Sequence, residues 1–101
     1  MIRYQALDRC FSNRYKRYYI EDLVEECNKA IYDFTGSLEG VKKRTIFSDI
    51  SYMESPQGWN APIKRVYEGK RCYYVYEEEN FSINKKDLSE AELETIDEAL
   101  V

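Results

Sequence analysis

Apolar residues in the first third of the chain recur at the spacing of helices that bury one face. A four-residue repeat predicts a first helix over about residues 2–11, with apolar positions at Ile2, Ala6 and Cys10. A stronger pattern predicts a second helix over residues 20–34, with apolar positions at Ile20, Leu23, Val24, Cys27, Ile31 and Phe34. We expect this second helix to end at Gly36, because glycine readily adopts the left-handed conformation that closes a helix.

The apolar period changes from helical to alternating in the second half of the chain. A third helix is predicted over about residues 41–55, with Ile46, Ile50 and Met53 on its core face. β-branched and aromatic residues then dominate residues 63–67 and 71–76. Because a short loop containing Gly69 joins these two segments, they are predicted to form a β-hairpin.

The last quarter of the chain has a pattern of its own. Phe81–Ile83 is predicted to be a short extended piece, and Ser89 with Glu92 forms a capping box that predicts the start of a helix. The apolar stripe of this last helix consists of Leu93, Ile96 and Leu100. We therefore expect two parts, a domain over residues 1–79 and an acidic linker with a C-terminal helix over residues 80–101.

The predicted order of three helices, a hairpin and a last helix is typical of a winged helix-turn-helix domain. The expected fold is therefore mainly α with a β-hairpin wing, followed by a C-terminal amphipathic linker helix. In the helix-turn-helix, the recognition helix enters the major groove of DNA. Winged helices also mediate protein contacts, so the fold by itself does not decide between these functions.

Composition removes several classes of function. The chain of 101 residues has no His and no CxxC motif, so a metal site is not expected, and Cys10, Cys27 and Cys72 are predicted to be reduced. Because the sequence has no glycine-rich phosphate loop and no GxSxG, neither enzyme activity nor a cofactor is expected. No apolar run is long enough to span a bilayer, and the N-terminus has no secretory signal, so we expect a cytoplasmic protein.

Charge is distributed unevenly along the chain, although the net charge is only −4. Residues 1–76 hold 13 Lys and Arg against 10 Asp and Glu, whereas residues 77–101 hold 2 against 9. The cations form three clusters, and we predict that these clusters share one face and contact the phosphates of DNA. The candidates for phosphate contact are Arg14, Lys16, Arg17, Lys42, Lys43, Lys64, Arg65, Lys70 and Arg71.

The predicted third helix carries side chains that are suited to reading bases. At about 100° per residue, its outer face lies opposite Ile46. Arginine can bind guanine through two hydrogen bonds, hydroxyl groups can bond to several bases, and an aromatic ring can contact the thymine methyl group. The candidates for base contact are Arg44, Thr45, Phe47, Ser48 and Ser51. Asp49 lies near the core edge, where we expect it to pair with an arginine of the first or second helix.

Several segments, taken in order, resemble one family of regulators. Residues 44–50, Arg-Thr-Ile-Phe-Ser-Asp-Ile, resemble the recognition helix of DeoR-type repressors and, more closely, the N-terminal winged helix of bacterial WYL-domain transcription regulators. Similar segments are Arg3–Asp8, Tyr19–Leu23, Gly58–Ile63, Tyr73–Tyr74 and Leu88–Glu92. The sequence departs from the family at Lys42, Phe47 and Ser48, where relatives often carry a hydroxyl residue and two arginines. The resemblance implies a DNA-binding part of a longer regulator, or a stand-alone version, with any effector bound by a WYL domain that this sequence does not contain.

The expected function is sequence-specific binding of double-stranded DNA by a bacterial transcription regulator, without catalysis. The alternative is a winged helix that binds proteins, for which the acidic tail and the aromatic wing are suited. The wing tyrosines are Tyr67, Tyr73, Tyr74 and Tyr76. In the main interpretation these tyrosines form the sheet core and cross-strand pairs. A weak homodimer through Leu93, Ile96 and Leu100 is also predicted, because a short terminal helix is stable in water only if its apolar face is buried.

Overall fold

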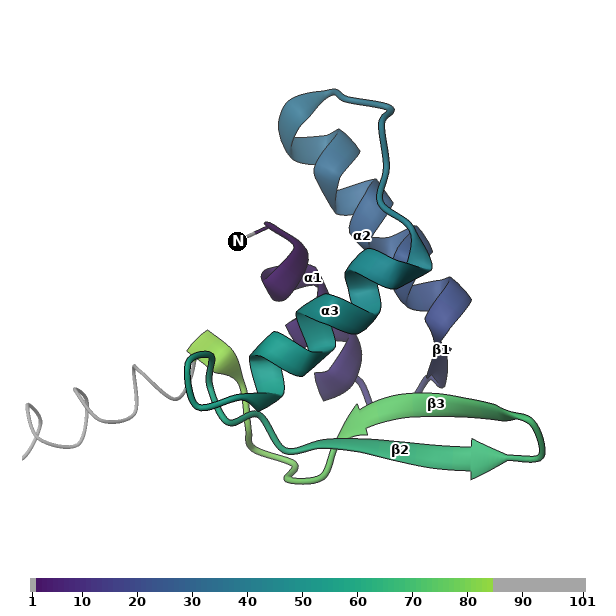
Figure 1. The fold of residues 1–101 in the computed structure, drawn as a ribbon, viewed down its shortest axis with the longest axis vertical. Coiled ribbons are helices and arrows are strands. Elements are labelled where there is room, and N and C mark those ends of the chain that lie inside the picture. Colours follow the sequence, from purple (N-terminus) through teal and green to yellow (C-terminus); the bar gives the residue numbers. More distant parts are fainter. Residues whose placement is uncertain (1, 85–101) are drawn as a thin grey trace, which may run out of the picture.

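The computed structural model, which describes residues 2–84, contains three helices and a small sheet (Figure 1). In chain order the elements are α1 (Ile2–Ser12), β1 (Tyr18–Tyr19), α2 (Ile20–Thr35), α3 (Lys43–Glu54), β2 (Ile63–Glu68) and β3 (Arg71–Tyr76). In Figure 1, α3 crosses in front of α1, and the hairpin of β2 and β3 extends below the helices. The expected winged helix, mainly α with a β-hairpin wing, is confirmed.

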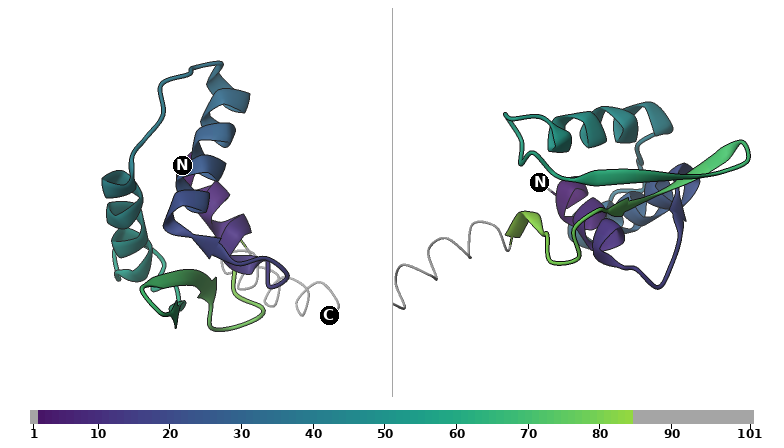
Figure 2. Two further views of the ribbon diagram at one scale, coloured as in Figure 1. Left: turned by 90° about the vertical axis from the view of Figure 1, so that its right-hand side faces the viewer. Right: turned by 90° about the horizontal axis from the view of Figure 1, so that it is seen from below.

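The hydrophobic core lies between the three helices and one face of the sheet. Side chains with almost no exposed surface are Leu7, Phe11, Leu23, Cys27, Ile46, Ile50, Met53, Tyr76 and Ile83. Figure 2 shows α3 as a separate outer layer in both views, held to the rest through this core. Phe34 ends the predicted apolar stripe of α2 but is 76% exposed, because it reaches only the rim of a hollow over α1 that Ile2 and Ala30 also line.

The ends of α2 follow from local sequence. Gly36 has a φ of 74° and its N–H donates to the carbonyl of Tyr32 at 2.8 Å, which confirms the predicted end of the helix. At the other end, the Asp22 carboxylate accepts a hydrogen bond from the Tyr19 backbone N–H at 2.9 Å. α3 begins at Lys43 and ends at Glu54, within two residues of the predicted bounds.

The sheet has three strands in the order β1-β3-β2, all antiparallel. The hairpin was predicted, whereas β1 was not, because two residues are too few to show an alternating pattern. Tyr18 lies opposite Tyr74, and this pair belongs to the face that packs on the helices. We call this the inner face, and its residues on the hairpin include Ile63, Arg65, Tyr74 and Tyr76. The outer face carries Lys64, Val66, Tyr73 and Val75.

The tyrosines of the wing do not share one environment. Tyr74 and Tyr76 are buried in the core, and Tyr73 is half-buried against the ring of Tyr19, as the prediction of core and cross-strand pairs requires. Tyr67 departs from that prediction, because it lies near the end of the hairpin and its side chain is 71% exposed.

The described chain continues past the wing and returns to the core. Ile83 is 2% exposed, and the ring of Phe81 packs edge-on against Tyr76 with centroids 4.7 Å apart. The predicted extended piece at Phe81–Ile83 is wrong, since Phe81 and Ser82 have no regular structure and Ile83 begins a helical turn. The predicted C-terminal helix, with its stripe of Leu93, Ile96 and Leu100, lies outside the described residues.

A buried carboxylate holds this returning segment. Asp8 of α1 is 5% exposed and accepts three hydrogen bonds. The donors are the Tyr76 hydroxyl at 2.7 Å, the Ser82 hydroxyl at 2.9 Å and the Ile83 backbone N–H at 3.0 Å. The pKa of Tyr76 is raised, first by burial and then by its hydrogen bond to Asp8.

The three free cysteines are expected to differ in reactivity. Burial raises the pKa of Cys10 and of Cys27 to about 12, whereas Cys72 is half-buried in the wing. Because the thiolate is the reactive form, only about one in 10⁴ molecules carries it at a buried site at pH 8. We expect one thiol per chain to react rapidly with a thiol reagent at pH 8, and all three after denaturation. Fast labelling of three thiols in the native protein would contradict this burial.

Candidate nucleic-acid interface

The outward surface of α3 carries the predicted base-contact residues. The side chains of Arg44, Phe47, Ser48 and Ser51 are exposed, and Thr45 is half-buried beside them. They lie on the side of the helix away from the buried residues Ile46, Ile50 and Met53. The outward surface therefore offers a guanidinium, three hydroxyl groups and an aromatic ring without disturbing the core.

Two ion pairs fix the position of α3. Arg3 of α1 binds the buried Asp49 through two bonds, at 2.6 Å and 3.2 Å, and this hydrogen bonding raises the pKa of Arg3. The predicted pairing of Asp49 with an arginine of the first or second helix is thereby confirmed. Arg65 of β2 binds Glu54 in the last turn of α3 in the same two-pronged way, at 2.8 Å and 3.2 Å. α3 is thus held to α1 on one side and to the wing on the other.

Glu21, in the first turn of α2, connects the start of α3 to the wing. Its carboxylate lies 3.2 Å from the Lys43 ammonium and 3.9 Å from the Arg71 guanidinium. Arg71 also lies over the ring of Tyr19, 3.7 Å from the centroid. The pKa of Glu21 is lowered, first by a backbone hydrogen bond and then by Lys43. Two phosphate candidates from separate elements therefore converge on one exposed carboxylate.

A small groove separates α3 from the wing. It has a volume of about 190 Å³ and is lined by Tyr19, Ile20, Glu21, Phe47, Lys70, Arg71, Cys72 and Tyr74. The ring of Phe47 faces this groove, and Lys70 and Arg71 stand on the wing side of it. We use the name α3-side surface for the outward residues of α3 together with the cations at its start and at the wing end. It comprises Lys42, Lys43, Arg44, Thr45, Phe47, Ser48, Ser51, Lys70 and Arg71. Arg71 belongs by register to the outer face of the sheet, and it is included because its guanidinium approaches Glu21 and lines this groove.

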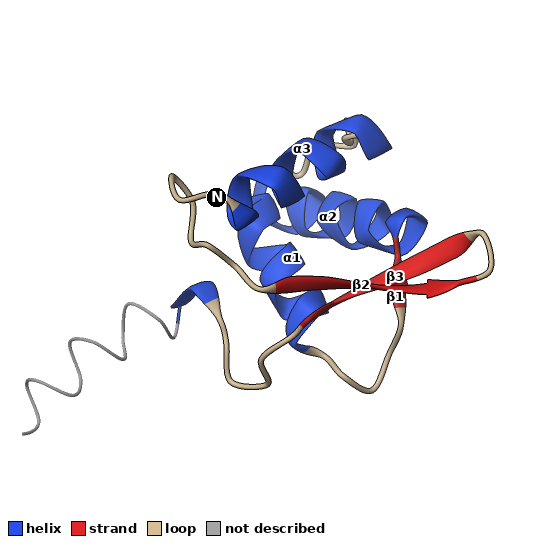
Figure 3. Cartoon of the chain, turned by 60° about the horizontal axis from the view of Figure 1, so that its bottom comes forward, coloured by secondary structure: helices blue, strands red, loops and turns tan. Residues whose placement is uncertain are grey.

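The remaining phosphate candidates do not belong to the α3-side surface. Lys64 is on the outer face of the sheet, because neighbouring residues of a strand point to opposite faces. Arg14, Lys16 and Arg17 lie in the loop between α1 and β1, on the side of the hairpin opposite α3 (Figure 3). Arg65 is on the inner face and is engaged by Glu54. The expectation that all cationic clusters share one face is therefore wrong.

Comparison with known proteins agrees with this architecture. Residues 1–77 match the family described as the N-terminal winged helix domain of WYL domain-containing proteins. The chain belongs to this family. No curated protein and no solved structure matches the chain. Such winged helix domains are generally parts of DNA-binding regulators, and the resemblance inferred from the sequence is confirmed.

In this WYL-family winged helix, sequence reasoning did not find the acids that accompany the cations. Glu21 neutralises part of the charge of Lys43 and Arg71, and Glu68 pairs with Arg17 and with the Tyr19 hydroxyl. Glu68 is opposite Arg71 in the register of the hairpin, which would indicate a pair with Arg71 rather than the observed pair with Arg17. Nothing in the local sequence places Glu21 near Lys43 and Arg71, which are 22 and 50 positions further along the chain. These contacts depend on the tertiary fold.

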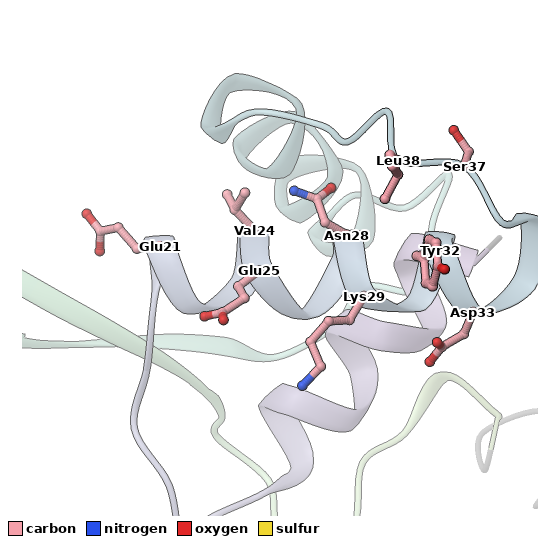
Figure 4. Close-up of a pocket in the computed structure, with 9 residues that line it drawn as sticks. All are labelled: Glu21, Val24, Glu25, Asn28, Lys29, Tyr32, Asp33, Ser37 and Leu38. Atoms are coloured by element: carbon pink, nitrogen blue, oxygen red, sulfur yellow. The ribbon is translucent and has the colours of Figure 1, made fainter.

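Another hollow of the described winged helix has a different character. It runs along α2 with a volume of about 540 Å³ and is drawn in Figure 4. Its polar lining includes Glu21, Glu25 and Asp33 against a single cation, Lys29. Phosphates would be repelled there, so this hollow does not suit nucleic acid. In the described part of the chain, no helix has the length and apolar character needed to cross a membrane.

Proposed function

We propose that the α3-side surface binds double-stranded DNA in a sequence-specific way, as the DNA-binding domain of a bacterial transcription regulator in the cytoplasm. α3 would lie in the major groove, with Arg44, Ser48 and Ser51 toward base edges. Thr45 and Phe47 flank them and suit contact with the thymine methyl group. Lys42, Lys43, Lys70 and Arg71 would bind phosphates on either side. The protein supplies binding, and the mechanism has no covalent step.

The observation that carries this proposal is the rigid presentation of α3. Its buried face is anchored by Asp49 and Glu54, and its other face turns a guanidinium and hydroxyl groups to solvent. Cations at the start of a helix oppose its dipole, and Glu21 pairs with only one of them, Lys43. Lys42 caps α3 without a side-chain hydrogen bond, so its ammonium group is not used by the fold.

The proposed division of roles between base and phosphate contacts is testable by substitution. A preferred duplex is first selected from a randomised pool with the whole chain. Arg44→Ala and Ser48→Ala are then expected to weaken binding to that duplex by about 1–3 kcal/mol each and to relax base preference. Lys70→Ala should weaken all duplexes alike and reduce the salt slope by about 0.9. Lys29→Ala, on the acidic side of α2, is the control.

Two results would contradict the assignment of these roles. One is a pool from which no sequence is enriched. The other is a reversed pattern, in which Lys70→Ala alters base preference while the α3 variants bind as the wild type does. The predicted homodimer is a separate proposal, because the residues that would form it lie outside the described chain.

A second candidate function, contact with another protein, is supported by the exposed apolar residues around the end of α2. Tyr32 is 51% exposed, Phe34 76% and Leu38 89%. Binding through such a surface depends weakly on salt, whereas binding to phosphates weakens steeply as salt is added. Replacement of Leu38 and Phe34 by serine would abolish a protein contact of this kind and leave DNA affinity unchanged.

A further inference from the structure

The loop between α1 and β1 presents three cations in a defined conformation. Arg14, Lys16 and Arg17 lie in it, and it contains no acid. Asn13 shapes the loop, because its side-chain carbonyl accepts from the Tyr15 N–H at 3.0 Å and its amide donates to the Tyr18 hydroxyl at 3.3 Å. The side chain of Asn13 therefore contributes two hydrogen bonds to the conformation of this loop.

The three cations line a hollow against the outer face of the sheet. This hollow has a volume of about 340 Å³, and its lining residues are Arg14, Tyr15, Lys16, Arg17, Tyr73 and Val75. The floor is formed by half-buried residues of β3, and the ring of Tyr15 is fully exposed to solvent. The concave shape places several positive charges around one space, which lowers the energy of an anion there.

Most of these charges have no carboxylate partner among the described residues. Arg17 pairs with Glu68 and lies over the ring of Tyr73. Arg14 donates to the Tyr76 carbonyl at 2.6 Å, and Lys16 lies 5.1 Å from the centroid of the Tyr18 ring. Among the described residues, Arg14, Lys16 and the neighbouring Lys64 form no ion pair with a carboxylate. Three full positive charges on one face are therefore available to an external anion.

The hollow and the α3-side surface lie on opposite sides of the wing. In Figure 3, α3 is above the hairpin and the loop from α1 to β1 is below it, and the right-hand view of Figure 2 agrees. A duplex has a phosphate backbone on each side of every groove. With α3 in the major groove, the hairpin beside it would lie along a bordering phosphate backbone. A hairpin with cations on both faces is matched to that arrangement, because each face can meet a different backbone segment.

We propose that the outer face of the sheet, with Arg14, Lys16, Arg17 and Lys64, is a second phosphate-binding surface that holds a flanking backbone segment of the same DNA duplex. This rests on the proposed function of the α3-side surface. It extends that function, because the wing then lies between two backbone segments and the cations behind it add affinity without reading sequence. Arg17 exchanges its pair with Glu68 for a phosphate, whereas Arg14, Lys16 and Lys64 have no such pair to lose.

The test neutralises the two faces separately in the whole chain. Lys16→Gln with Lys64→Gln removes two outer-face charges and leaves the bond from Arg14 to the Tyr76 carbonyl intact. We expect the slope of log affinity against log salt to become shallower by about 1.8, and affinity for duplex at 0.1 M salt to fall by about 60-fold. Lys29→Gln with Arg9→Gln, which removes two exposed charges of α2 and α1, is the matched control and should bind as the wild type does.

The outcomes distinguish failure of the outer-face proposal from failure of the proposed function. If the wild type binds duplex and Lys43→Gln with Arg44→Gln weakens it, while the outer-face variant binds normally, the outer-face proposal is overturned and the proposed function stands. If the wild type does not bind duplex at low salt, both fail. If the outer-face variant loses binding to single-stranded DNA but binds duplex as the wild type does, the proposal is overturned in favour of a site for single strands.

A second measurement tests whether one duplex meets both faces. In an NMR titration with duplex, the backbone amides of residues 14–17 are expected to shift with the same midpoint as those of α3. A separate, weaker midpoint for the loop would mean a second DNA molecule and would contradict the proposal. Absence of any shift at residues 14–17 would contradict it as well.

Discussion

Replacement of Asp8 by alanine is expected to lower the free energy of unfolding by about 2–4 kcal/mol. The carboxylate is 5% exposed and accepts bonds from Tyr76, Ser82 and Ile83. Its loss leaves a buried hydroxyl and a buried backbone N–H without an acceptor, and it also leaves a cavity. For a domain of this size, the melting temperature should fall by about 10 °C or more.

Urea unfolding followed by circular dichroism measures this change, and two variants make it specific. Asp33→Ala removes an exposed acid from α2 and should change the unfolding free energy by less than about 0.5 kcal/mol. Asp8→Asn keeps the shape but replaces one acceptor by a donor, so an intermediate loss is expected. Wild-type stability of Asp8→Ala would show that this carboxylate does not hold the segment after the wing to α1.

Reversal of two charges at the start of α3 is expected to have the largest effect on DNA binding. Lys43→Glu with Arg44→Glu should lower affinity for duplex at 0.1 M salt by about 100-fold or more. Loss of the proposed phosphate contact of Lys43 accounts for about eightfold at that salt concentration, from about 0.9 released counterions per contact. Loss of the proposed base contact of Arg44 adds about 1–3 kcal/mol, which is about 5- to 150-fold. Repulsion between the new carboxylates and the phosphates adds to the loss.

The control for this reversal is an equal change of charge elsewhere. Lys29→Glu with Arg9→Glu alters two exposed cations of α2 and α1 that lie away from the α3-side surface. Both double variants should melt as the wild type does to within a few degrees, and fluorescence anisotropy with a labelled duplex gives their affinities. Equal losses in both variants would indicate a response to net charge alone and would contradict a localised surface.

The parts of the fold that could be predicted were those with a long apolar period. α2 shows this best, because its stripe and Gly36 together marked the helix and its end. β1 could not be predicted, since its two residues become a strand only by pairing with Tyr73 and Tyr74. The burial of Asp8 was equally hidden, because its three donors come from positions at least 68 residues away in sequence.

The candidate site was predictable where a single helix determined it. Helical geometry placed Arg44, Ser48 and Ser51 opposite Ile46, and the exposed side chains agree with that placement. The cations outside α3 were harder to place, because a cluster in sequence need not be a cluster in space. For Lys64 and Arg65, the alternation of a strand already separates adjacent residues, and this signal could have shown from the sequence that the wing has two charged faces.

The most direct test of the account is the salt dependence of duplex binding by the whole chain. The selected duplex and a scrambled duplex of the same length are titrated between about 50 and 200 mM salt. The account predicts that log affinity falls linearly with log salt for both, with a slope of at least about −3 from the cations of the α3-side surface, and that the selected duplex binds more tightly throughout. Affinity that is absent at the lowest salt, or that does not change with salt, would contradict DNA binding through this surface.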